Sequence, residues 1–89
     1  MELGNEQINR IISLARSYGA TRLILFGSAA KVPAEARDID LACDGAAGWK
    51  LYEMAARIED ELHALVDIIP LSPPNRFTKK IEERGRILL

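Results

Sequence analysis

The chain has 89 residues, of which 48% are hydrophobic and 28% are charged, and 12 Lys and Arg stand against 13 Asp and Glu for a formal net charge of -1. This length predicts one small domain, 1–89, whose fold buries roughly 60 to 65% of the surface that the unfolded chain exposes. The balanced charge argues against a general nucleic-acid binder, and the composition argues against a disordered or fibrous protein.

The number of cysteines and the N-terminal sequence indicate the cellular compartment that we expect for the protein. With one cysteine, Cys43, and one histidine, His63, the chain can form neither an internal disulfide nor a structural zinc site by itself. The N-terminus lacks a basic region followed by an apolar one, and no apolar run approaches the ~20 residues of a membrane span. We therefore expect a cytoplasmic protein, with Cys43 buried and inert and His63 at a helix end or packed rather than bound to metal.

The first quarter of the chain predicts a helix and then a strand. Residues 5–18 have apolar positions at helical spacing, with Asn5 as a candidate N-cap and Gly19 where helices often end in left-handed backbone. These apolar positions are Ile8, Ile11, Ile12, Ala15 and Tyr18. The apolar run 23–26 is too short for a helix, so we expect a buried strand.

A second strand and a second helix follow a turn-rich segment. Residues 38–43 have a strand pattern, and the dipeptide Asp44-Gly45 is typical of a turn that ends a strand. Residues 47–62 have the apolar spacing of an amphipathic helix, which Trp49 and Tyr52 would anchor to the core.

The remaining chain completes an α/β pattern. Residues 64–70 predict a third buried strand, and 75–84 predict a helix rich in basic residues. The first interpretation of these basic residues is a solvated helix face. The second interpretation is contact with phosphates or with an acidic partner. Strands that alternate with helices predict an α/β domain with a small mixed sheet of three strands, or slightly more, and helices packed on it.

Three acids interrupt the strand patterns. Asp38 and Asp40 occupy alternate positions of one strand, so both should project to one face while Ile39 and Leu41 project to the other. Asp67 lies within the third apolar run. A carboxylate beside apolar groups costs several kcal/mol unless a partner compensates it. A magnesium ion would do so, because it prefers oxygen ligands from one or two carboxylates, waters and phosphates.

Gly27-Ser28 lies at the end of the first strand and suits the phosphate end of such a site. Glycine allows close approach of a ligand to the backbone, and a strand-to-helix turn presents unpaired N–H groups that bind anions. A structural interpretation remains open, in which Gly27 is only a turn residue and Ser28 only a helix N-cap. Asp38 alone could likewise be an exposed strand start.

These positions carry a resemblance to a known family. Gly27-Ser28, then nine residues, then Asp38-Ile39-Asp40, and later Val66-Asp67-Ile68, resemble the nucleotidyltransferase fold of the DNA polymerase beta superfamily. The order of elements is most similar to that of its minimal nucleotidyltransferase proteins, the MntA-type antitoxins of HEPN/MNT pairs. Where many members have Ala-Arg-Gly after the Gly-Ser pair and its following residue, this chain has Ala30-Lys31-Val32.

The resemblance implies a function and a site. Asp38, Asp40 and Asp67 would be the catalytic and metal-binding residues and would hold two Mg²⁺ ions, with Asp67 as general base or as a metal ligand only. Gly27, Ser28 and Lys31 would bind the nucleotide. The substrate would be ATP or another nucleoside triphosphate, and AMP, or another nucleoside monophosphate, would pass to a hydroxyl of a small helical HEPN-type partner.

Two other functions remain open at this point. The chain could be an antitoxin that neutralises its partner by binding alone, since it has no added domain for an acceptor. A phospho-acceptor receiver domain also places acids at strand ends but needs more strands than this chain has. The oligomeric state stays open, a homo-oligomer included, and so does the nucleobase.

Overall fold

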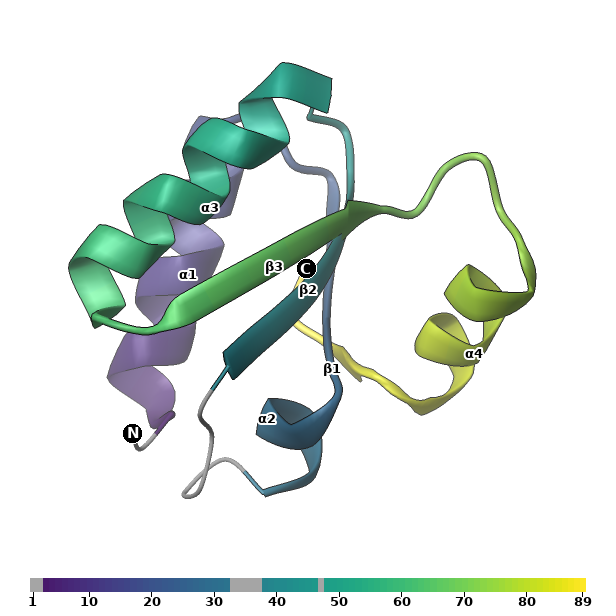
Figure 1. Cartoon of the computed structure of the whole chain (residues 1–89), viewed down its shortest axis with the longest axis horizontal. Coiled ribbons are helices and arrows are strands. Elements are labelled where there is room, and N and C mark those ends of the chain that lie inside the picture. The colour runs from purple at the N-terminus through teal and green to yellow at the C-terminus, as the bar shows by residue number, and fades with distance from the viewer. Residues whose placement is uncertain (1–2, 33–37, 47) are drawn as a thin grey trace.

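One mixed sheet organises the residues that the computed structural model describes, which are 3–32, 38–46 and 48–89. The elements in chain order are α1 (Asn5–Ser17), β1 (Arg22–Phe26), α2 (Ser28–Lys31), β2 (Asp38–Asp44), α3 (Gly48–Leu62), β3 (Leu65–Pro70), α4 (Arg76–Arg84) and β4 (Arg86–Ile87). The strand order is β3-β2-β1-β4, with β1 antiparallel to β2 and β4, and β2 parallel to β3 (Figure 1). The predicted α/β class with a small mixed sheet is confirmed.

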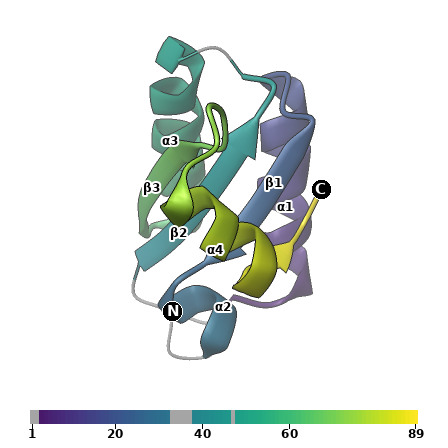
Figure 2. The ribbon, with the colours of Figure 1, turned by 90° about the vertical axis from the view of Figure 1, so that its right-hand side faces the viewer.

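Helices cover the two faces of the sheet unequally. Helices α1 and α3 lie on one face, and α4 lies on the other, in front of the sheet in Figure 2. The larger core cluster fills the α1/α3 face and takes Ile39, Leu41 and Cys43 from β2. The smaller cluster joins Ile24 and Ala42 of the opposite face to Ile81 of α4. Because successive strand residues point to opposite faces, each central strand contributes to both clusters.

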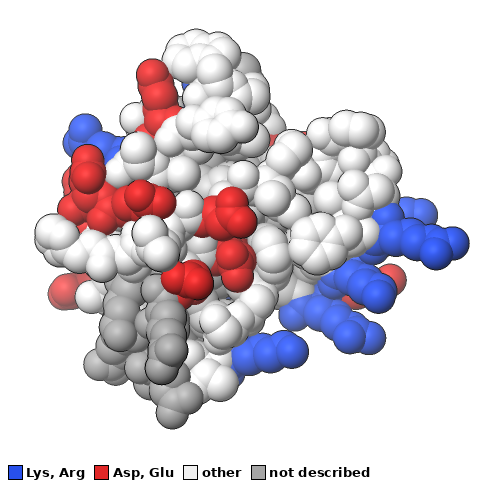
Figure 3. Space-filling model, viewed as in Figure 1, with Lys and Arg blue, Asp and Glu red and all other residues white. Residues whose placement is uncertain are grey.

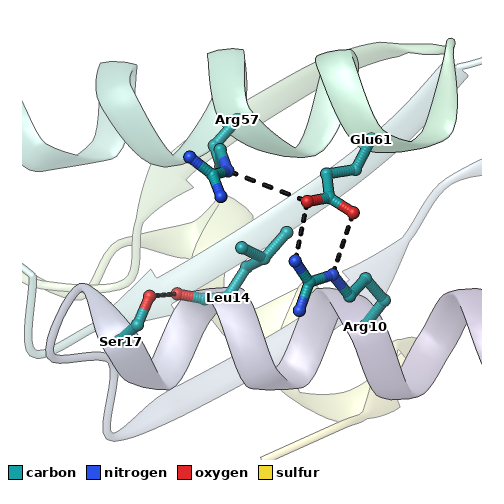
Figure 4. Close-up of polar contacts among 5 residues, drawn as sticks. All are labelled: Arg10, Leu14, Ser17, Arg57 and Glu61. Carbon is teal, nitrogen blue, oxygen red and sulfur yellow. Dashed lines mark hydrogen bonds and ion pairs between the residues drawn. The ribbon is translucent and has the colours of Figure 1, made fainter.

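Apolar burial holds α1 and α3 to the sheet, and an ion pair joins them at the surface. Ile11 and Ile58 are fully buried between these layers. Arg10 donates two hydrogen bonds to the Glu61 carboxylate, at 2.9 and 2.7 Å, and Arg57 lies 3.8 Å from the same group (Figure 4). Water screens exposed ion pairs of this kind, so the apolar contacts dominate the packing of α1 and α3.

Helix α4 is fixed at both ends and along its length. The Asn75 side chain accepts a hydrogen bond from the Thr78 amide at 2.9 Å, which caps the helix. The Phe26 and Phe77 rings meet edge to face, with centroids 5.8 Å apart. At the other end, a β-carbon on Gly85 would lie 2.5 Å from Ile24, so α4 approaches β1 as closely as glycine permits.

Several local predictions were wrong. The fourth strand, β4, falls within the predicted sheet of three strands or slightly more, but its position at Arg86–Ile87 was not predicted. Trp49 and Tyr52 do not anchor α3, because they are 62% and 82% exposed. The N-cap of α1 is Gly4, whose amide donates to the Gln7 side chain, rather than Asn5.

Other local predictions are confirmed. Gly19 and Gly45 have left-handed backbone at φ 94° and 100°, where the helix stop and the turn were expected. Cys43 is buried, and burial raises the pKa of its thiol. His63 is exposed directly after α3 in left-handed backbone, as a helix-end residue. Among the described helices, none is both long enough and apolar enough to cross a bilayer.

Candidate functional site

Strand β2 places its two acids on the face opposite α1 and α3. Ile39 and Leu41 are fully buried in the larger core, whereas Asp38 is exposed and Asp40 is partly buried. Residues of even number in β2 share one face, and there Ala42 packs under α4. Asp38 and Asp40 lie on the same face, nearer the start of the strand. This face is therefore apolar at Ala42, where α4 covers it, and acidic at Asp38 and Asp40.

Strand β3 adds the third acid through its register. Asp67 pairs directly with Asp40 in the parallel β2–β3 ladder, which places the two side chains next to each other on one face. Asp38, Asp40 and Asp67 all line a pocket of about 260 Å³. We call this pocket and its three acids the acidic site. In Figure 3, red side chains gather over β2 and β3 at the middle of the face.

The electrostatics of Asp40 reflect this crowding. Loss of water around the carboxyl raises the pKa of Asp40, and the negative charges of Asp67 and Asp38 raise it further. Like charges on adjacent strands destabilise each other, and a bound cation would remove that repulsion.

The sequence missed Glu59, which also lines the acidic site. Its carboxylate accepts a hydrogen bond from the Val66 amide at 3.0 Å and so ties α3 to the start of β3. On the helical pattern Glu59 is an ordinary outward-facing residue, and only the packing of α3 beside β3 brings it to this pocket. The bond gives Glu59 a structural role at the rim.

Gly27 is fitted to its contact with Asp40. Its backbone has φ 72° and ψ -154°, a region that only glycine adopts without strain, and a β-carbon there would lie 2.5 Å from Oδ2 of Asp40. Asp40 also pairs with Phe26 across β1 and β2. The carboxylate therefore lies directly against the turn, which presents bare backbone to the acidic site.

Ser28 and Lys31 continue from this turn. Ser28 is the first residue of α2 rather than its N-cap, which is Gly27. Lys31 is the last residue of α2 and lines a second pocket, of about 190 Å³, to which Gly27 also contributes. The structure thus brings all six predicted site residues to one end of the sheet. Val32 closes the described part of this loop, and residues 33–37, including Arg37, lie outside the described residues.

The donor set suits magnesium that arrives with phosphate. Within residues 3–32, 38–46 and 48–89, no group of three or more His, Cys, Asp or Glu is arranged to hold a metal ion on protein ligands alone. Magnesium is usually held by one or two carboxylates together with waters and substrate phosphates, not by a cage of protein ligands. The three carboxylates line an open pocket, and the pKa of the Asp40 carboxyl is raised by loss of water and by its acidic neighbours. This arrangement fits that mode of binding.

Comparison with known proteins gives the fold. No protein-family model matches the chain, and no curated protein matches it. A solved structure described as a candidate minimal nucleotidyltransferase is 27% identical, with a TM-score of 0.76, over 96% of this chain and 94% of that one. A toxin–antitoxin structure with AMP-PNP is 25% identical, with a TM-score of 0.76, over 92% of this chain and 72% of that one.

A third match is the tri-AMPylated HEPN toxin of Shewanella oneidensis in complex with MNT antitoxin. It is 24% identical, with a TM-score of 0.73, over 94% of this chain and 70% of that one. The resemblance predicted from Gly27-Ser28, Asp38, Asp40 and Asp67 is therefore confirmed at the level of the fold.

Proposed function

We propose that this chain, which has the fold of the minimal nucleotidyltransferases, transfers AMP from ATP to a hydroxyl of a HEPN-type partner protein and so acts as its antitoxin. The observation that carries the proposal is the convergence of Asp38, Asp40 and Asp67 on one open pocket beside Gly27. The similarity to structures that hold AMP-PNP and an AMPylated HEPN toxin supports the choice of nucleotide and acceptor.

The chemistry is an in-line displacement at the α-phosphorus. The hydroxyl oxygen of the partner forms a bond to the α-phosphorus, the bond from that phosphorus to the bridging oxygen breaks, and pyrophosphate leaves. Asp67, the exposed acid on the edge strand, would accept the hydroxyl proton. When bound, two Mg²⁺ ions held by Asp38, Asp40 and Asp67 would neutralise charge on the attacking and leaving oxygens.

The residues around the acids bind and position the phosphates. Gly27 leaves the backbone open to a phosphate, and the Ser28 hydroxyl can donate one hydrogen bond to it. Lys31 adds a positive charge to the pocket that Gly27 also lines. The polyphosphate is thereby oriented for attack at its first phosphorus.

The acidic site needs a partner to complete it. The pocket is open to water, and Asp67 and Asp38 are exposed. A docked protein would exclude water and hold its hydroxyl in line, and such positioning accounts for a large share of the rate acceleration of many enzymes. We therefore expect negligible turnover by the chain alone.

Mass spectrometry of the partner tests the proposal. The parent chain is incubated with ATP, Mg²⁺ and a HEPN-type protein. A parallel reaction uses the D38N/D40N double variant in place of the parent as the control. The expected result is a mass gain on the partner in units of AMP, which the double variant does not produce. Neutralisation of the partner without added mass, achieved equally by the double variant, would overturn the transferase assignment.

A second function, neutralisation by binding alone, has its own support. Trp49 and Tyr52 present exposed aromatic rings on α3, and large exposed aromatic side chains are typical of protein–protein interfaces. A stable complex with the partner in the absence of nucleotide, with full neutralisation by the double variant, would favour this function.

A further inference from the structure

The pocket beside Gly27 that lies away from the acids has a basic lining. Its volume is about 190 Å³, and its walls come from α2 and its turn and from α4. Lys31, Lys80 and Arg84 supply three cations over an apolar floor of Phe26 and Ile81. We call it the basic pocket. Figure 3 shows blue side chains gathered over α4 at the right of the face, with uncharged side chains between them and the red ones of β2 and β3.

The basic pocket is built on fixed elements. Lys80 and Arg84 are four residues apart on α4, so both point to the same side of that helix. The helix itself is held by the Asn75 cap, and between the two cations lies Ile81, which is buried against the sheet. The packing of α4 therefore fixes the backbone from which both side chains extend.

In the part of the chain that the structure describes, Lys31, Lys80 and Arg84 form no ion pair. Glu82, an acid on the same helix, instead lies 3.1 Å from Arg22 of β1. Three cations that share a pocket repel one another, and a bound polyanion would relieve that repulsion.

We propose that Lys80 and Arg84, together with Lys31, bind the terminal phosphates of the nucleoside triphosphate, so that the basic pocket holds the pyrophosphate that leaves. This inference rests on the proposed function. Gly27 links the two pockets, because it lies against Asp40, which lines the acidic site, and itself lines the basic pocket. A triphosphate lying across Gly27 places its α-phosphorus at the acids and its β- and γ-phosphates among the cations.

Binding of inorganic tripolyphosphate without metal tests the pocket directly. Isothermal titration calorimetry in EDTA at low salt compares the parent chain with K80Q/R84Q and with a matched control, R76Q/K79Q. The control removes two charges from the same helix at positions that do not line the pocket. We expect K80Q/R84Q to weaken binding by about tenfold and the control to change it by less than about twofold.

A second measurement locates the phosphates that the pocket binds. AMP, titrated with Mg²⁺, has no β- or γ-phosphate, so K80Q/R84Q should leave its affinity unchanged, whereas the affinity for ATP with Mg²⁺ should fall. Equal loss for AMP and ATP would overturn the inference. Circular dichroism and thermal unfolding of each variant establish that α4 is intact.

The outcomes separate this inference from the proposed function. If ATP binds with Mg²⁺ and AMP is transferred, but K80Q/R84Q behaves like the parent, the proposed role of the basic pocket is wrong and the transferase assignment stands. If tripolyphosphate binding depends on Lys80 and Arg84 but no AMP is transferred, the pocket stands and the transferase fails. Displacement of tripolyphosphate by a single-stranded oligonucleotide at lower concentration than by ATP would contradict a nucleotide site.

Discussion

Asp40 has the most constrained environment of the three acids. It lies between Phe26 on β1 and Asp67 on β3, and it contacts the bare backbone of Gly27. Its pKa is raised, first by loss of water and then by the charges of Asp67 and Asp38. Because the ionised form is less favourable in the folded chain than in the unfolded one, Asp40 lowers stability at neutral pH.

Asp40→Asn should therefore stabilise the fold while it abolishes Mg²⁺-dependent binding of ATP. The pKa in the folded state exceeds the unfolded value, so the folded chain retains its proton to higher pH. The parent loses the corresponding stability as pH rises from the unfolded pKa through the folded one. Urea denaturation should show the variant more stable than the parent at pH 7, with the difference vanishing below the unfolded pKa. Retained Mg²⁺-dependent ATP binding would contradict the role of Asp40.

Gly27→Ala should damage both the turn and the site. The backbone conformation at Gly27 costs a residue with a side chain about 1 to 3 kcal/mol, and the added methyl group would displace the Asp40 carboxylate. We expect a loss of stability in that range, measured by urea denaturation, and loss of ATP binding. Gly48→Ala is the matched control, because nothing lies within 4 Å of its added β-carbon. An equal effect of both substitutions would remove the special role of Gly27.

At the scale of elements, α4 should be sensitive to its cap. Asn75→Ala removes the hydrogen bond to the Thr78 amide, which predicts a loss of about 0.5 to 2 kcal/mol. Chemical denaturation followed by circular dichroism measures it. The same substitution at Asn9, which is exposed within α1, should be neutral or slightly stabilising. If both variants unfold alike, the cap does not contribute.

The sequence predicted most elements because their patterns are local. Alternation in 38–43 and the short apolar run 23–26 identified two strands, since a strand with one buried face repeats every second residue. The alternation in 38–43 also predicted that Asp38 and Asp40 lie on one face of β2. The placement of Trp49 and Tyr52 was wrong because helical spacing fits more than one choice of buried face. In the structure Leu51, Met54 and Ile58 form that face.

What the sequence could not predict depends on contacts between distant residues. Strand β4 has two residues, and it exists because Ile87 pairs with Ile24, more than sixty positions earlier. The basic pocket likewise requires α2 and α4 to pack so that Lys31 and Lys80 line the same pocket. Neither a two-residue strand nor a pair of separated lysines carries a periodic signal. The predicted roles of Asp38, Asp40, Asp67, Gly27, Ser28 and Lys31 in catalysis and binding stay predictions.

At the scale of the molecule, the C-terminal strand closes the sheet. Beyond the Ile24–Ile87 pairing, Leu23 donates to the Leu89 carbonyl at 3.2 Å, and its own carbonyl accepts from Leu88 and Leu89 at 2.8 and 3.1 Å. Removal of residues 86–89 should cost about 0.5 to 1.5 kcal/mol for each lost bond. A domain of this size has a total stability of roughly 5 to 13 kcal/mol. Thermal unfolding should therefore show a large drop, and an unchanged midpoint would contradict this account.

The closure of the sheet by its last strand also has a consequence for protein synthesis. A ribosome adds residues in order, and β1 emerges long before residues 86–89, which complete its outer edge. Until those residues leave the exit tunnel, β1 has an unpaired edge of apolar residues, and such edges pair readily with other chains. The nascent chain can therefore complete its sheet only after residues 86–89 have left the tunnel, and chains cut short before residue 86 should be substrates for chaperones and proteases.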